Sequence, residues 1–159
     1  MLAQISEVLI ANPTLGVKTL EDFVRLAKAS PGKITYSSAG NGHVQHLFME
    51  LFQRKAGLAL VHVPYKGVPP GLQAVVSGEV GVTNVGLGLA RPLIASGKVV
   101  ALAKTGYVTK DALPGVPALT ATYPDVDFTG WIALFAPKGT PNDVVAKLNA
   151  EIGKALALP

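Results

Sequence analysis

The sequence predicts an α/β fold in which helices flank a sheet rich in parallel strands. Between residues 17 and 105, short runs of β-branched residues alternate with stretches whose apolar residues recur at helical spacing. This alternation is typical of βαβ units joined by short loops. The chain has 159 residues, of which 49% are hydrophobic, so it can bury a sizeable core without metals or disulfides. The same composition excludes intrinsic disorder.

The elements of this unit can be placed in order along the chain. Residues 2–11 form a mostly apolar strand that Asn12-Pro13 ends, because proline removes a backbone donor. Thr19 to Asp22 resembles a capping box and opens a helix that ends before Pro31-Gly32. We then expect strands at 34–37, 60–64, 80–85 and 99–104, and helices at 44–55, 70–77 and 87–95.

The last third of the chain follows a different pattern. Residues 106–127 contain three prolines and little periodicity, which indicates a connector. An apolar strand is expected at 128–136, and a helix at about 142–156 with Thr140 as its cap and Pro141 in its first position. The residues of this helix expected to face inward are Val144, Val145, Leu148, Ile152 and Leu156.

The two long apolar strands, at 2–11 and 128–136, flank the α/β unit as hinge strands flank one lobe of a two-lobed protein. In this interpretation most of the other lobe is missing, and the apolar surface that it covers accounts for the high hydrophobic content. We also expect a soluble chain. Residues 1–7 lack the features of a secretory signal, and no run of about 18 apolar residues occurs.

Charge and cysteine content exclude several kinds of site. The net charge is +4, but lysines and arginines are scattered and aromatic residues are few, which argues against a nucleic-acid face. A small anionic ligand suits the charge. The absence of cysteine removes thiol catalysis, zinc knuckles and disulfide frameworks.

The most informative segment is Tyr36 to His46, between a predicted strand and a predicted helix. Gly40 and Gly42 allow a sharp turn, and the free N–H groups of a first helical turn attract an anion. Ser38 and Asn41 add neutral hydrogen-bond donors. We therefore expect unsatisfied main-chain amides beside Asn41 to hold the ligand. The alternative is an ordinary βα turn with an N-cap.

Two further strand ends are expected at the same edge of the sheet. Tyr65 and Lys66 follow the strand at 60–64, and Asn84 and Val85 end the strand at 80–85. Open α/β sheets bind ligands at the carboxyl ends of their strands. Taken singly, a solvated surface lysine and a packed rim tyrosine are the better explanations of Lys66 and Tyr65, so the prediction depends on their joint placement.

Catalytic, metal and nucleotide sites are weakly supported. His43, His46 and Glu50 can share one helical face, but a helix N-terminus disfavours a cation and no HExxH motif occurs. No GxSxG motif is present. Gln45 stands where a dinucleotide fingerprint has its third glycine. We assign no catalytic residue, metal or cofactor.

Several ordered segments together resemble the Bug (TctC-like) family, the extracytoplasmic solute receptors of tripartite tricarboxylate transporters. The resemblance covers nearly the whole chain. The segments that show it are Ser38-Ala39-Gly40-Asn41-Gly42 with His46, Val61 to Gly67, Leu113 to Pro117, Gly130-Trp131 and Ala136 to Pro141.

The resemblance implies a lobe of a type II-like periplasmic-binding protein, not an enzyme. Residues 13–107 would be the complete second lobe, 108–127 a connector, and 1–12 with 128–159 the hinge strands and a remnant of the first lobe. The complete receptor would be a periplasmic monomer that captures a small organic carboxylate and presents it to permease subunits in the membrane. The implied ligand-binding residues are Ser38, Ala39, Gly40, Asn41, Gly42, His46, Tyr65, Lys66, Gly67, Asn84 and Val85.

The sequence departs from the family pattern at several positions, and two other functions stay open. His43 stands where the family often has serine, Val68 replaces a usual glycine and Gly81 a frequent aspartate, so the ligand's identity is not fixed. One alternative is an enzyme that binds a phosphate ester at the Gly40–Gly42 loop. The other is an interaction module that self-associates through exposed apolar surface.

Overall fold

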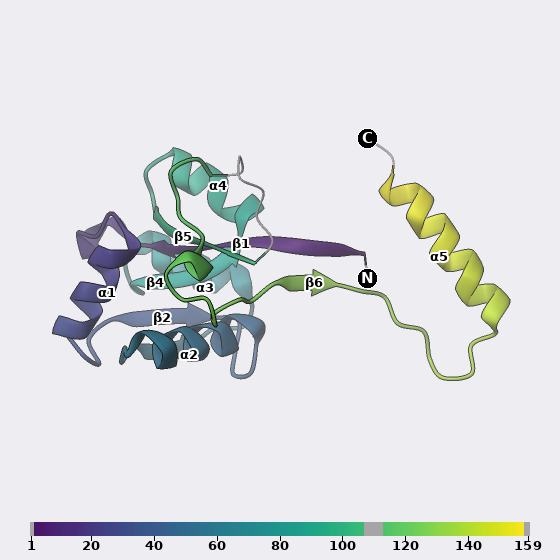
Figure 1. The fold of residues 1–159 in the computed structure, drawn as a ribbon, viewed down its shortest axis with the longest axis horizontal. Coiled ribbons are helices and arrows are strands. Elements are labelled where there is room, and N and C mark those ends of the chain that lie inside the picture. Colours follow the sequence, from purple (N-terminus) through teal and green to yellow (C-terminus); the bar gives the residue numbers. More distant parts are fainter. Residues whose placement is uncertain (1, 107–112, 158–159) are drawn as a thin grey trace. The chain divides into compact units, whose positions relative to one another are not determined.

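A computed structural model describes residues 2–106 and 113–157, and the chain divides into two compact units. The core unit comprises Ile5–Gly130, and the terminal unit comprises Met1–Gln4 with Trp131–Pro159. The strands are β1 (Ala3–Ala11), β2 (Thr35–Ser38), β3 (Val61–Pro64), β4 (Val82–Gly86), β5 (Val100–Gly106) and β6 (Gly130–Ile132). The helices are α1 (Leu20–Ala29), α2 (Val44–Ala56), α3 (Val68–Ser77), α4 (Leu87–Ala95) and α5 (Asn142–Leu156), with 3-10 turns η1 (Pro13–Leu15) and η3 (Leu119–Ala121) (Figure 1).

The elements predicted up to residue 104 are confirmed, and their bounds differ by two residues or fewer. The capping box is confirmed in part. Thr19 Oγ1 accepts a hydrogen bond from the Asp22 amide at 3.1 Å, and this bond fixes the start of α1. The Asp22 carboxylate accepts from the Lys18 amide, one residue before the cap. The predicted connector lies partly outside the described residues, and its described part contains η3.

The sheet has the strand order β3-β2-β4-β1-β5, and β6 pairs with β1. Strand β2 is parallel to both β3 and β4, whereas β1 is antiparallel to its neighbours β4 and β5. The expected parallel-rich α/β sheet is therefore confirmed, with β1 as the strand of opposite direction. Because β2, β3 and β4 run the same way, their carboxyl ends lie at one edge of the sheet.

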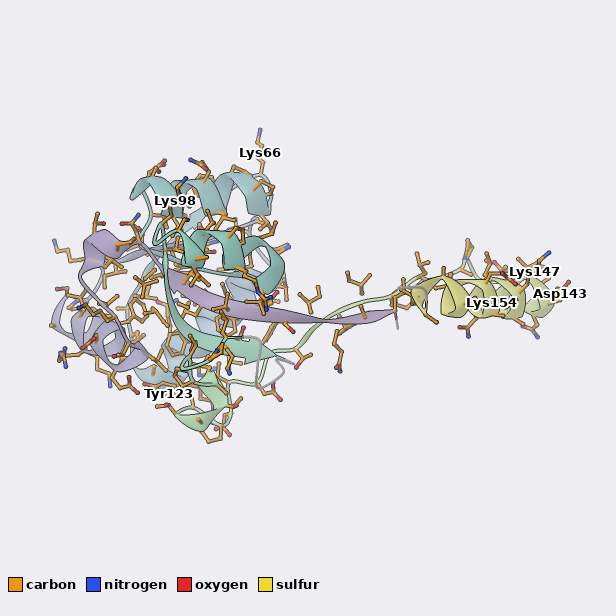
Figure 2. The ribbon with its side chains drawn as sticks, turned by 90° about the horizontal axis from the view of Figure 1, so that it is seen from above. Lys66, Lys98, Tyr123, Asp143, Lys147 and Lys154 are labelled. Atoms are coloured by element: carbon orange, nitrogen blue, oxygen red, sulfur yellow. The ribbon has the colours of Figure 1, made fainter. Side chains whose placement is uncertain are left out.

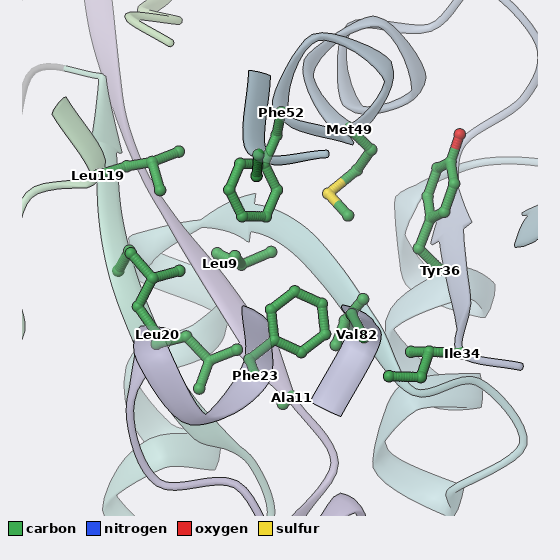
Figure 3. Close-up of a cluster of buried hydrophobic side chains, with 14 of the residues drawn as sticks. Leu9, Ala11, Leu20, Phe23, Ile34, Tyr36, Met49, Phe52, Val82 and Leu119 are labelled. Carbon is green, nitrogen blue, oxygen red and sulfur yellow. The ribbon is translucent and has the colours of Figure 1, made fainter. Parts of the chain in front are cut away.

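Helices cover both faces of the sheet, and β1 contributes to both cores. Leu9 and Ala11 pack in the cluster that contains side chains of α1 and α2, part of which Figure 3 shows. Val8 and Ile10, which point the other way, pack with α3 and α4. Successive side chains of a strand point to opposite faces, so a central strand covered on both sides is apolar throughout. This explains the continuous apolar run at the start of the chain.

The strand predicted at 128–136 is wrong for most of its length. Regular pairing covers Gly130–Ile132 alone, and residues 133–136 have no regular structure. The apolar residues that suggested a strand are exposed, with Leu134 at 67% and Phe135 at 82% of their full exposure. An apolar run favours a strand when a sheet face covers it, and these side chains have no such cover within the described residues.

Helix α5 is confirmed, but its predicted inward face is not buried. Val144, Val145, Leu148 and Leu156 are exposed, and no residue of α5 is buried. Part of this face lines an open hollow of about 340 Å³ within the terminal unit. Thr140 is also not the cap, because its hydroxyl donates to the Pro137 carbonyl oxygen and Pro141 occupies the N-cap position.

Candidate functional site

Three helices of the core unit begin at the edge where β2, β3 and β4 end. Helix α2 follows β2, α3 follows β3, and α4 follows β4 directly. None of the three has an acidic residue in its first turn, and α3 and α4 have no side-chain cap. First-turn N–H groups and the helix dipoles make such an edge attractive to anions.

The turn between β2 and α2, residues 39–43, is the most open part of this edge. Gly40 has φ of 130° and Gly42 has φ of 76°, a region that residues with a side chain rarely adopt. Asn41 and Gly42 are exposed, and Ala39 is half-buried. The two glycines therefore present the backbone of this turn to solvent, as the sequence predicts.

Several amides of this turn already have partners within the protein. The Ala39 amide donates to Gln45 Oε1 at 3.0 Å, the Gly40 amide to Ser38 Oγ at 3.1 Å, and the Gly42 amide to His46 Nδ1 at 3.1 Å. Within the described chain, the amides of Asn41, Val44 and His46 have no hydrogen-bond partner. The expected unsatisfied amides beside Asn41 are thus fewer than the sequence suggests, because side chains of Ser38, Gln45 and His46 fold back onto the turn.

Ser38 is buried, and its hydroxyl is fully engaged. It lies 2.6 Å from His62 Nε2, it donates to the Gly40 carbonyl oxygen at 3.0 Å, and it accepts from the Gly40 amide. A hydroxyl has one proton to donate and two lone pairs to accept with. These contacts use that capacity, so Ser38 shapes the turn around Gly40.

Three rings stack beside the turn. The rings of His46 and His62 lie 4.0 Å apart, with 9° between their planes, and His62 stacks on Tyr36 at 4.8 Å. The Tyr36 hydroxyl donates to Glu50 Oε1 at 2.6 Å. Burial and the nearby His46 lower the pKa of His62, and the Glu50 carboxylate partly opposes this effect. Burial and the bond to Glu50 raise the pKa of Tyr36.

Gln45 joins the ends of two strands. Its carboxamide accepts from the Ala39 amide after β2 and donates to the Asn84 carbonyl oxygen in β4 at 2.5 Å. The Gln45 side chain is buried; its bond to Asn84 is buried and its bond to Ala39 is partly buried. Gln45 therefore holds the turn at a fixed position relative to β4.

Asn84 and Val85 are both buried. The Asn84 carboxamide donates to Glu7 Oε2, and its Oδ1 accepts from the Thr105 hydroxyl at 3.0 Å. This network joins β1, β4 and β5. The Asn84 side chain, expected at the ligand, is thus occupied by neighbouring strands.

Glu7 is a carboxyl group in the interior of the sheet, with 6% of the residue exposed. Burial raises the pKa of Glu7, and the hydrogen bond from Asn84 partly offsets that effect. Beneath the edge of the sheet, the protein therefore holds an acid that is easier to protonate than an ordinary glutamate.

Tyr65, Lys66 and Gly67 form the turn from β3 to α3. The Tyr65 amide donates to the Ser38 carbonyl oxygen at 2.9 Å, and its hydroxyl donates to Glu79 Oε1 at 3.0 Å. Burial and this contact with Glu79 raise the pKa of Tyr65. Lys66 is exposed, and Figure 2 shows its side chain extending away from the ribbon. Gly67 is the N-cap of α3, with φ of 112°.

The structure thus brings the predicted residues to one edge of the core unit but divides them by accessibility. Asn41, Gly42 and Lys66 are exposed, whereas Ser38 and Asn84 are enclosed. Sequence reasoning missed Gln45, His62 and Glu7. Gln45 is a polar residue on the apolar face of the first turn of a predicted helix, and this pattern could have indicated its structural role. His62 and Glu7 need the register of the sheet, which places His62 beside Tyr36.

The described residues contain neither a metal-binding cluster nor a membrane-spanning helix. Within residues 2–106 and 113–157, no group of three or more histidine, aspartate or glutamate side chains is arranged to hold a metal ion. In the same ranges, no helix is long and apolar enough to cross a membrane.

Comparison with known proteins identifies relatives over the whole chain. The family model described as "Tripartite tricarboxylate transporter family receptor" matches residues 1–159. A UPF0065 protein from the tcbD–tcbE intergenic region of Pseudomonas sp. strain P51 is 35% identical over 100% of this chain and 48% of its own length. Protein BugT of Bordetella pertussis is 32% identical over 98% of this chain and 48% of its own length. The chain spans about half the length of these relatives.

Solved structures show the same fold. A structure described as a periplasmic transporter has a TM-score of 0.92 and 36% identity, over 99% of this chain and 53% of that one. Rpa4515 of R. palustris, solved with adipate, has a TM-score of 0.90 and 29% identity over the same shares. MatC of Rhodopseudomonas palustris, solved with malate, has a TM-score of 0.87 and 31% identity, over 98% and 53%. Fold, family model and relatives agree, and the chain belongs to the tripartite tricarboxylate transporter receptor family.

Proposed function

We propose that this chain forms one side of the binding site of a periplasmic receptor, which captures a small organic carboxylate and presents it to the permease subunits of a tripartite tricarboxylate transporter. Residues 13–107 form the ligand-binding lobe. Residues 1–12 and 128–159 are the hinge strands with part of the other lobe, and 108–127 connect them. Family membership and the likeness to a periplasmic transporter support the location and the partner.

One observation carries the proposal. Helices α2, α3 and α4 begin at the carboxyl ends of three parallel strands, and their first turns contain no acidic side chain. An anion at this edge meets N–H groups of these first turns, although Pro69 and Pro70 of α3 have none to donate, and it meets no opposing carboxylate there. Two structural neighbours were solved with dicarboxylates, adipate and malate, which agrees with an anion of this class.

The predicted site residues divide into two roles. Asn41, Gly42 and Lys66 contact the ligand, because the turn at 41–42 and the Lys66 side chain are exposed at this edge. His46 controls the Gly42 amide through its hydrogen bond. The other predicted residues keep these groups in place, and they are Ser38, Ala39, Gly40, Tyr65, Gly67, Asn84 and Val85.

The receptor works by binding and does not turn its ligand over. Ser38, the serine of the turn, is buried, and its hydroxyl is engaged by His62 and Gly40, so we assign it a role in shaping the turn. The proposed enzyme acting on a phosphate ester and the proposed self-associating module are not favoured, because the family comprises solute receptors.

A titration of the 159-residue chain tests the proposal. Adipate and malate are the probes, and hexane-1,6-diol is the uncharged control. Because this chain spans about half the length of its relatives, we expect weak binding, with Kd of about 1 mM, or about −4 kcal/mol. Asn41→Ala should weaken binding, and Asn142→Ala, an exposed asparagine in the terminal unit, should not. Failure of both acids to bind, or equal binding of the diol, would contradict the proposal.

A further inference from the structure

The hydrogen bond from the Gly42 amide to His46 occupies one ring nitrogen of that imidazole. Nδ1 of His46 accepts the Gly42 N–H at 3.1 Å. A ring nitrogen that accepts a hydrogen bond carries no proton, and a protonated imidazole donates from both nitrogens. As long as this bond is present, Nδ1 of His46 cannot carry a proton.

The groups that face His46 come from three elements. His62 of β3 lies parallel to the His46 ring at 4.0 Å. Tyr36 of β2 stacks at 6.5 Å, and its hydroxyl is bound to Glu50. Glu50 of α2 places Oε1 3.9 Å from His46 Nε2, a position in which a carboxylate stabilises a positive imidazolium. Of these groups, Glu50 supplies a negative charge, and His62 is a second imidazole, whose pKa burial lowers.

A ligand carboxylate at the turn changes this arrangement. The Gly42 N–H forms one strong hydrogen bond at a time, so a ligand carboxylate at this amide competes with Nδ1 of His46. Once released, Nδ1 is free to accept a proton, and the resulting positive ring lies between the ligand's charge and Glu50. We propose that carboxylate binding at the turn is coupled to the uptake of one proton by His46. This inference rests on the proposed function.

Two other histidines lie near the turn, and both are less suited to this role. Burial and the stacked His46 lower the pKa of His62, whose Nε2 is also held 2.6 Å from Ser38 Oγ. His43 is the N-cap of α2, and its Nδ1 accepts from the Gln45 amide at 3.3 Å. A ligand at the Gly42 amide competes with neither of these bonds.

The test measures Kd for adipate from about pH 8.5 to about pH 6.5, a range in which free carboxylic acids stay ionised. Coupling to one proton predicts that binding tightens as the pH falls, by up to about tenfold per pH unit. His46→Asn keeps an oxygen that can accept the Gly42 N–H but does not titrate, so this variant should bind with a pH-independent Kd. His43→Asn keeps an N-capping group and should retain the wild-type pH dependence.

Imidazole ¹⁵N chemical shifts of the wild-type chain supply a second measurement that does not depend on the folding of any variant. Addition of adipate at about pH 7 should move the His46 ring toward the protonated form and leave His43 unchanged. Adipate binding with no pH dependence, a pH dependence retained by His46→Asn, or an unchanged His46 ring would each overturn the inference while the proposed function stands. Absence of adipate binding at every pH would overturn both.

Discussion

The hydroxyl oxygen of Ser38 lies 2.6 Å from Nε2 of His62, and this contact ties the last residue of β2 to the middle of β3. Both residues also shape the turn, because the Ser38 hydroxyl donates to the Gly40 carbonyl oxygen and the His62 ring stacks on the His46 ring. The polar residues beneath this edge therefore position the backbone of the turn that we propose as the ligand site.

Ser38→Ala should lower the free energy of unfolding by about 1–3 kcal/mol, because a buried hydroxyl with three hydrogen-bond contacts is lost. Urea denaturation followed by circular dichroism measures the change. Ser96→Ala is the matched control, since the Ser96 hydroxyl makes one exposed bond to Leu93, and it should change stability by less than about 0.5 kcal/mol. Equal effects of the two substitutions would show that Ser38 is not a structural residue.

Gln45→Ala should destabilise the chain by about 1–3 kcal/mol, because the Ala39 amide and the Asn84 carbonyl oxygen lose a buried partner. Hydrogen exchange of the Ala39 amide should become faster in this variant. Gln73→Ala, an exposed glutamine on α3, should leave both quantities nearly unchanged. An unaltered exchange rate at Ala39 would contradict the role assigned to Gln45.

Glu7→Gln should make the chain more stable than wild type at neutral pH. Burial raises the pKa of Glu7 in the folded state, so the stability from its protonated form is present below the ordinary pKa of glutamate. That contribution is lost as the pH rises through the raised, folded-state pKa. Glutamine cannot ionise, and its Oε1 can still accept from Asn84.

Thermal unfolding of both chains from about pH 4 to about pH 8 tests this. The advantage of Glu7→Gln should grow as the pH rises. A difference between the two chains that stays constant with pH would mean that Glu7 does not titrate as its burial predicts.

Gly40→Ala should cost about 1–3 kcal/mol of stability, because φ of 130° is rarely accessible to a residue with a side chain. Gly88→Ala is the control. Gly88 lies within α4, and an added Cβ there meets nothing within 4 Å, so this change should stabilise the chain by up to about 1 kcal/mol. Chemical denaturation of both variants measures the contrast, and a neutral Gly40→Ala would show that the turn can adopt another conformation.

The sequence was sufficient to predict the core unit because its signals are local. Alternating strand and helix patterns, the cap at Thr19 and the glycines at 40 and 42 each act within a few residues, and the structure has these features. The expected strand ends placed the predicted site residues at one edge of the sheet. The βαβ pattern implies that these strands run the same way, whereas the strand order, with β1 between β4 and β5, comes from the structure.

What the sequence could not supply were contacts across the sheet. The bond from Asn84 to Glu7 joins residues far apart in the chain, and the pairing of His62 beside Tyr36 depends on register. The strand expected at 128–136 failed for a related reason. Apolar content predicts burial, but Phe135 has no covering layer within the described residues, so the run does not form a strand.

The amides of the turn after β2 offer the most direct test of the central claim, which is that the backbone between Ala39 and Val44 holds the carboxylate. A ¹H–¹⁵N NMR titration of the 159-residue chain with adipate should shift the Asn41, Gly42 and Val44 amides together, with a common Kd. Hexane-1,6-diol should leave these amides unchanged. Shifts confined to other parts of the chain, with these three amides unmoved at saturating adipate, would contradict the account.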